Sequence, residues 1–307
     1  MSDTIVFPAA NAGDRTTPLA ESQDVRIAGL HVYPVKSCGG IAVPQALVVE
    51  TGFEFDRFWV LVDEAGVHVT QRTQPRLALV SSKFSHGQLV LRAPGMLALH
   101  VALDQVAAEQ AEMVKVWDDE ISAYDMGTLA RQWFSDYLGV PVRFMRLDPE
   151  FKRICDPKWT AGFTGQAAFS DGFSLLVVSQ ASLDNLNERL AAGGHAPVGW
   201  DRFRPNLVLD GLQAHQEDLL DELTFQTPAG PVRLKLVKPC TRCIVPNIDQ
   251  ATAKKGTQPS GTLIRYRRDP AMGGVITFGM NAIVIEGADC LLNTGLAGQA
   301  AVKAAAT

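Results

Sequence analysis

FWVLVDEAGVHVTQ, residues 58–71, decides the fold class, because two runs of β-forming residues flank a short polar turn. Phe, Trp and Val favour extended strands, and the Glu64–Gly66 segment supplies the residue types that close a tight turn. The stretch therefore predicts a β-hairpin that turns at Glu64–Gly66.

Short β-rich runs of the same kind, broken by Gly, Pro or Asp, lie on both sides of this hairpin. They predict a mainly β protein with a few helices, built from barrel-like sheets. Strands are expected at 26–35, 45–50, 58–66, 68–73, 77–84, 88–94, 173–179, 206–211, 223–227, 232–238, 262–268, 275–279 and 282–287.

Two segments have helical periodicity instead. In 128–139, Gly139 should end the helix, and in 182–194, Ser182 could cap the start and Gly193–Gly194 end it. The residues expected on the buried faces are Leu129, Trp133, Phe134, Tyr137 and Leu138 in the first helix, and Leu183, Leu186 and Leu190 in the second.

Length and charge restrict the class of protein. The chain has 307 residues and a formal net charge of −5, which is enough for two domains and argues against nucleic acid as the main partner. No apolar run approaches the roughly 18 residues of a membrane span, so none is expected.

The ends and middle of the chain suggest where domains begin and end. Residues 1–24 lack a secretory pattern and are expected to be a disordered lead-in, and 297–307 is expected to be a small-sided tail. The stretch 146–165 has no clean period. We therefore expect an N-terminal module at 25–150 and a second domain at 151–296.

Cysteine usage favours a reducing, cytoplasmic location. The five cysteines are sparse and odd in number, which argues against a disulfide scaffold. They are Cys38, Cys155, Cys240, Cys243 and Cys290.

The sharpest local motif is KPCTRC at 238–243, which follows a predicted strand. One CxxC can be a redox pair, half of a zinc site or ordinary core packing, and the spacing alone leaves these open. Lys238, Arg242, Lys254 and Lys255 lie nearby in the sequence, and positive neighbours stabilise a thiolate that can bind a soft metal.

Three other segments carry polar groups where a β-rich core would not need them. Lys36–Gly40 could be a simple turn, Arg57 an ion-pair partner of Asp56, and Arg204–Asn206 a strand entry. Together they offer cationic side chains, a Ser hydroxyl, open backbone N–H groups and an amide, which suit a polyanion with a hydrogen-bonding ring.

Taken together, these motifs resemble the MOSC-domain proteins, most closely the mitochondrial amidoxime-reducing components and their bacterial relatives. The resemblance runs from about Arg26 to about Gly287. It rests on VYPVKSCGG, DRFWVLVDEAG, SDGFSLLVVSQASLDNLNERL, FRPNLVLDG, CTRCIVPNID and YRRDPAMGGVITFGMNAIV, in that order.

The resemblance implies a MOSC-type β-barrel domain packed with an N-terminal β-barrel-like module, and a molybdenum cofactor of the molybdopterin type. It makes Cys243 the metal ligand and places Asp249 near the metal as a second candidate catalytic residue. The positions that match cofactor contacts are Lys36, Ser37, Arg57, Gly172, Phe173, Arg204, Asn206, Thr241 and Arg242.

The reaction implied is reduction of N-hydroxylated compounds, with electrons from a separate iron–sulfur, haem or flavin protein, because Cys290 alone cannot hold an iron–sulfur cluster. The segment CIVPNIDQATAKKG departs from the family's usual pattern, which leaves the substrate open. Two alternatives remain: a sulfur carrier with a persulfide on Cys243, and a cofactor-binding protein without turnover.

Overall fold

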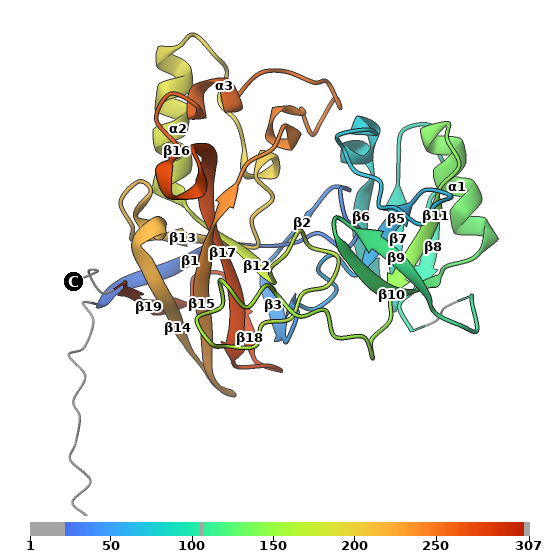
Figure 1. The fold of residues 1–307 in the computed structure, drawn as a ribbon, viewed down its shortest axis with the longest axis horizontal. Helices are drawn as coiled ribbons and strands as arrows, with labels where there is room; N and C mark the ends of the chain where they lie inside the picture. Colours follow the sequence, from blue (N-terminus) through green and yellow to red (C-terminus); the bar gives the residue numbers. More distant parts are fainter. Residues whose placement is uncertain (1–21, 105–106, 304–307) are drawn as a thin grey trace, which may run out of the picture.

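The computed structural model describes residues 22–104 and 107–303. Figure 1 shows two bodies side by side, a larger one made mostly of the later strands and a smaller one that carries α1. Strands dominate both bodies, which confirms the prediction of a mainly β protein.

The larger body is a closed barrel of seven strands within the described residues. The ring closes because β12 pairs with β13 on one side and with β17 on the other. In ring order the strands are β12 (Leu175–Ser179), β13 (Leu207–Asp210), β1 (Ser22–Val32), β19 (Ala297–Val302), β14 (Leu220–Thr227), β15 (Gly230–Thr241) and β17 (Val275–Glu286).

Two short strands, β2 and β16, extend the barrel sheet, and three others form a separate small sheet. β2 pairs with β1, β16 pairs with β17, and β3 lies between β18 and β4 in a small sheet of its own. Their bounds are β2 Ile41–Val43, β3 Gln45–Val49, β4 Gly52–Phe53, β16 Arg268–Asp269 and β18 Leu291–Asn293.

The continuous apolar run of β12 follows from burial on both faces. Leu175 and Val177 pack into the barrel core, whereas Leu176 and Val178 pack under the helix α2 (Gln180–Ala192). Where β17 crosses β12, Gly279 has a φ of 75°, and an added Cβ would come within 2.4 Å of a Val178 methyl group. Only glycine fits this close approach.

The smaller body has its own core between two sheets and α1 (Thr128–Leu138). The turn predicted at Glu64–Gly66 is present, because Asp63 and Val67 close it, but the second arm of the predicted hairpin has only isolated bridges, such as that from His68 to Val62. The two sheets contain β5 (Trp59–Val62), β11 (Arg143–Leu147), β10 (Asp119–Asp125) and β9 (Glu112–Val116), and β6 (Ser81–Ser85), β7 (Gln88–Arg92) and β8 (Leu99–Ala102).

Both predicted helices are confirmed, with two corrections. Leu129 is 72% exposed, so the buried face of α1 is narrower than predicted. Ser182 does not cap α2; the Ser179 hydroxyl accepts from the Ser182 N–H, so the helix begins earlier. Gly139 ends α1 in a left-handed conformation, as predicted.

Two predicted strands are wrong. In 68–73, the Thr70 carbonyl and hydroxyl bind following residues and close a turn instead, which competes with a sheet ladder. In 262–268, Thr262 donates to the Gln258 side chain and closes the short helix α3 (Ser260–Leu263).

The five 3-10 helices of the described residues connect these elements. Residues 77–79, expected to be strand, belong to the first of them. They are η1 Pro75–Leu79, η2 Trp200–Arg202, η3 Gln216–Leu219, η4 Val245–Asn247 and η5 Pro270–Met272.

The predicted tail at 297–307 is wrong in its first part, because β19 lies between β1 and β14 and buries Ala300 completely. Of the lead-in at 1–24, residues 1–21 lie outside the described residues and the remainder belongs to β1. Strand β1 belongs to the predicted N-terminal module, yet it is part of the same ring as strands of the second predicted domain. The two predicted domains are therefore not separate in space.

Within the described residues, none of the helices combines the length and apolar character that crossing a bilayer requires.

Candidate functional site

A pocket gathers the predicted site residues from segments that are distant in sequence. Lys36, Ser37 and Arg57 line it from the N-terminal segments, and Cys243 comes from the segment after β15. The other predicted residues in its wall are Gly172, Phe173, Arg204, Asn206, Thr241 and Arg242.

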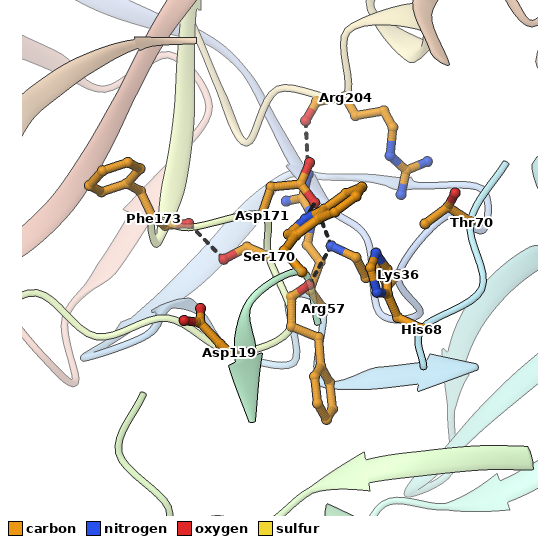
Figure 2. A network of polar contacts seen from close by, with 12 residues as sticks. Lys36, Arg57, His68, Thr70, Asp119, Ser170, Asp171, Phe173 and Arg204 are labelled. Carbon is orange, nitrogen blue, oxygen red and sulfur yellow. Dashed lines mark hydrogen bonds and ion pairs between the residues drawn. The ribbon is translucent and has the colours of Figure 1, made fainter. Parts of the chain in front are cut away.

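Lys36 is a buried cation in the lining of this pocket. It follows β1, is only 5% exposed, and its Nζ donates to the Phe169 carbonyl at 2.8 Å and to Asp171 Oδ1 at 2.6 Å. Figure 2 shows Lys36 and Asp171 pointing toward each other. Burial lowers the pKa of Lys36, and the Asp171 carboxylate opposes this shift.

Arg57 is held from three sides. Its Nη1 donates to Asp56 Oδ2 at 2.5 Å and to Asn206 Oδ1 at 2.8 Å, and its Nη2 donates to the Arg204 carbonyl at 3.0 Å. The proposed ion pair with Asp56 is thus present, but it is buried, because the Asp56 side chain has no exposed surface. The guanidinium is therefore fixed in the pocket wall.

Asn206 ties this arginine to the barrel. Its Oδ1 also accepts from the Leu176 backbone N–H at 3.1 Å, and its Nδ2 donates to the His31 carbonyl at 3.1 Å. The Asn206 amide therefore connects β1, β12 and the start of β13, and its Oδ1 accepts from Arg57 as well as from Leu176.

Two guanidinium groups share one aromatic ring. The Cζ atoms of Arg57 and Arg204 lie 4.4 and 4.3 Å from the centroid of Tyr33, which is 3% exposed. Burial, and then the charge of Arg57, lower the pKa of Arg204 to about 10, so the Arg204 guanidinium stays cationic at neutral pH.

The backbone is strained at this site. Ser37, Arg57 and Arg204 have φ values of 69°, 50° and 59°, in the left-handed region that non-glycine residues rarely occupy. Strain of this kind costs about 1–3 kcal/mol per residue and concentrates at ligand sites.

Cys243 contributes a half-buried thiol to the pocket, and its Sγ accepts from the Val245 backbone N–H at 3.5 Å. Arg242 beside it donates to the carbonyls of Phe203 and Phe278. Cys240 also lines the pocket while packing against the core under α2, and burial raises its pKa.

The chemistry of this wall fits a molybdopterin-type group. Its lining cations outnumber its acids, with Asp171 the sole carboxylate among the described lining residues. A phosphate-bearing ligand needs such a cationic wall, and a soft metal needs a thiolate. The lining cations are Lys36, Arg57, Arg72, Arg202, Arg204 and Arg242.

Not every predicted residue lies in the wall. Asp249 is outside the lining; its Oδ2 accepts from Arg202 at 2.7 Å and its Oδ1 accepts from Thr252. The Thr252 hydrogen bond and then Arg202 lower the pKa of Asp249. Lys238, Lys254 and Lys255 are also outside the lining, so of the four cations near the motif only Arg242 reaches the pocket.

The zinc alternative for the CxxC motif gains no support from the geometry, whereas Cys240 packs against the core. Within the described part of the chain, no group of three His, Cys, Asp or Glu side chains is placed to hold a metal ion. A zinc site would need such a group.

Sequence reasoning missed several lining residues. Arg72 and Trp117 come from turns, where no periodicity marks them. Asp171 directly precedes Gly172, which is one of the predicted site residues. The DG pair could have drawn attention to Asp171. The other unpredicted polar lining residues are Thr70, Ser170, Ser174, Arg202, Cys240 and Asn281.

Comparison with known families assigns the chain. The MOSC N-terminal beta barrel domain matches residues 24–141 and the MOSC domain matches residues 164–295. The chain therefore belongs to the MOSC-domain proteins.

Its relatives include amidoxime-reducing components. It is 33% identical over 249 residues to human mitochondrial amidoxime reducing component 2, covering 78% of this chain and 72% of that protein. It is 34% identical over 260 residues to human mitochondrial amidoxime-reducing component 1, covering 80% and 73%. A molybdenum cofactor sulfurase of Bos taurus is 26% identical over 285 residues, covering 88% of this chain and 32% of that protein.

Proposed function

We propose that this protein is a molybdenum-cofactor-dependent reductase of N-hydroxylated compounds, with the Cys243 thiolate as the protein ligand of the metal. The observation that carries the proposal is the pocket itself. It brings Cys243 into one wall with Lys36, Arg57 and Arg204, whose segments lie far apart in the sequence. The similarity to amidoxime-reducing components supports the choice of substrate class.

In this proposal the arginines and Lys36 bind the anionic part of the cofactor, and Asn206 and Ser37 orient it. Fixed guanidinium groups suit phosphate because their planar N–H pairs match its oxygens. The Cys243 sulfur holds the metal, and the bound cofactor supplies the redox chemistry that removes oxygen from an N–OH group.

The overall reaction consumes two electrons and two protons and releases water with the reduced substrate. The electrons come from a separate partner of iron–sulfur, haem or flavin type. A role for Asp249 in proton delivery remains a prediction, and its lowered pKa disfavours a proton on it near neutral pH. The cytoplasmic location also remains a prediction.

Metal and pterin analysis followed by an assay with reduced viologen dye tests the proposal. Protein from a host that makes the cofactor should contain about one molybdenum per chain and reduce benzamidoxime. Correctly folded protein that never contains molybdenum would contradict the proposal. A labile sulfur adduct of Cys243 without molybdenum would favour a sulfur carrier, and bound cofactor without turnover would favour a binding protein.

A further inference from the structure

Trp117 has a backbone conformation that large side chains avoid. It occupies the tight turn between β9 and β10, where Val116 pairs with Asp119, and its φ is 57°. Such turns usually place Gly, Asn or Asp at this conformation. A bulky aromatic residue there is a real outlier, and outliers of this kind cluster at ligand sites.

Three neighbours fix the indole ring. Its Nε1 donates to Asp171 Oδ1 at 3.0 Å, the Arg72 guanidinium carbon lies 4.3 Å from the ring centroid, and the His68 ring meets it edge-on at 4.4 Å between centroids. This support holds a strained residue in one orientation. The ring nevertheless remains 38% exposed.

The indole lines the same pocket as Cys243 but comes from the other body of the molecule. Trp117 belongs to the sheet of β9 and β10, and Cys243 follows the barrel strand β15 (Figure 1). A molecule bound between the two bodies can therefore meet the thiol on one side and the indole on the other.

Asp171 adds an acceptor beside the ring. Its Oδ1 already accepts from Lys36 and Trp117, whereas its Oδ2 has no hydrogen-bond partner among the described residues. The Asp171 side chain is 73% exposed. The free oxygen can accept N–H groups from a ligand that lies along the indole.

We infer that Trp117 is a specificity-determining residue that selects planar N-hydroxylated amidines by stacking, with Asp171 Oδ2 accepting their N–H groups. The inference rests on the proposed function. A flat head with N–H groups gains from both contacts, because it can pack on the π face of the indole and donate to the carboxylate. Hydroxylamine itself is too small to stack.

The test compares two substrates in the cofactor-loaded protein. Trp117→Leu should raise KM for benzamidoxime about tenfold, because a stacking contact of this kind contributes on the order of one tenfold step. The kcat for benzamidoxime and the kcat/KM for hydroxylamine should stay within about twofold. Trp117→Phe, which keeps a smaller aromatic face, should recover part of the KM.

A binding measurement separates this inference from the proposed function. Benzamidine, the reduced product of benzamidoxime, is titrated calorimetrically into wild type and into the Trp117→Leu variant, and its Kd should rise by a similar factor. Trp159→Leu is the matched control, since Trp159 is half-buried and lies outside the pocket lining. It should change neither KM nor Kd.

Molybdenum content is measured in every variant. Loss of molybdenum in Trp117→Leu would overturn the inference, because the indole would then support the cofactor. Equal losses for the two substrates, or an unchanged benzamidoxime KM, would also overturn it. If wild type reduces neither substrate, the proposed function fails; weaker benzamidine binding by Trp117→Leu would still support the indole contact, and unchanged binding would refute it.

Discussion

Asp56→Ala tests whether one buried carboxylate stabilises the cationic wall. Asp56 accepts from the Tyr33 backbone N–H at 2.8 Å and from Arg57 at 2.5 Å. The Asp56 side chain is fully buried and that of Arg57 is 12% exposed. Removing the acid leaves Arg57 beside Arg204 with no carboxylate in contact among the described residues.

Removing one partner of a buried pair costs about 3–5 kcal/mol, because the remaining charge stays desolvated. We therefore expect the free energy of unfolding to fall by about that amount in the cofactor-free protein, measured by urea denaturation followed by circular dichroism. The control is Arg131→Ala, which removes a pair with Asp125 whose arginine is 50% exposed. Exposed pairs contribute about 0–1 kcal/mol.

A loss below about 1 kcal/mol in Asp56→Ala, equal to that of the control, would refute this account. It would mean that water reaches Arg57 and that the wall is not a desolvated charge cluster.

Further predictions concern stability. Burial, followed by nearby cations, lowers the pKa values of His68 and His215 to about 4; the unfolded chain therefore takes up protons first, and Tm should fall as the pH drops from about 6.5 to 4. A flat Tm over that range would contradict it. Leu186→Ala should cost about 2–5 kcal/mol in urea denaturation, while Leu129→Ala, at an exposed position, should cost little; equal losses would contradict the assigned burial. Gly40→Ala should lower Tm, because its Cβ would lie 2.3 Å from a neighbouring tyrosine ring, and an unchanged Tm would show that the ring can move freely.

The sequence predicted the strands with clear period and the helix faces, because burial imposes those patterns locally. It failed where side chains close turns, as at Thr70 and Gln258, because such hydrogen bonds leave no periodic signal. It also placed 297–307 outside the core, since small residues show little hydrophobic pattern, although β19 completes the ring through backbone pairing.

The candidate site was predictable only in part for a similar reason. Motifs marked Lys36, Arg204 and Cys243, and the pocket brings them together. Trp117 and Arg72 could not be found, since their places depend on how the smaller body packs against the barrel. The sequence marks Asp56 only as an ion-pair partner of Arg57, whereas the burial of the pair gives it its importance.

X-ray absorption at the molybdenum edge tests the central claim most directly, in wild type and in Cys243→Ser. The account predicts that the serine variant, if it keeps its pterin, loses one sulfur scatterer from the metal's coordination shell. An unchanged sulfur count in that variant, or wild-type protein in which molybdenum has no sulfur beyond those of the pterin, would contradict the claim.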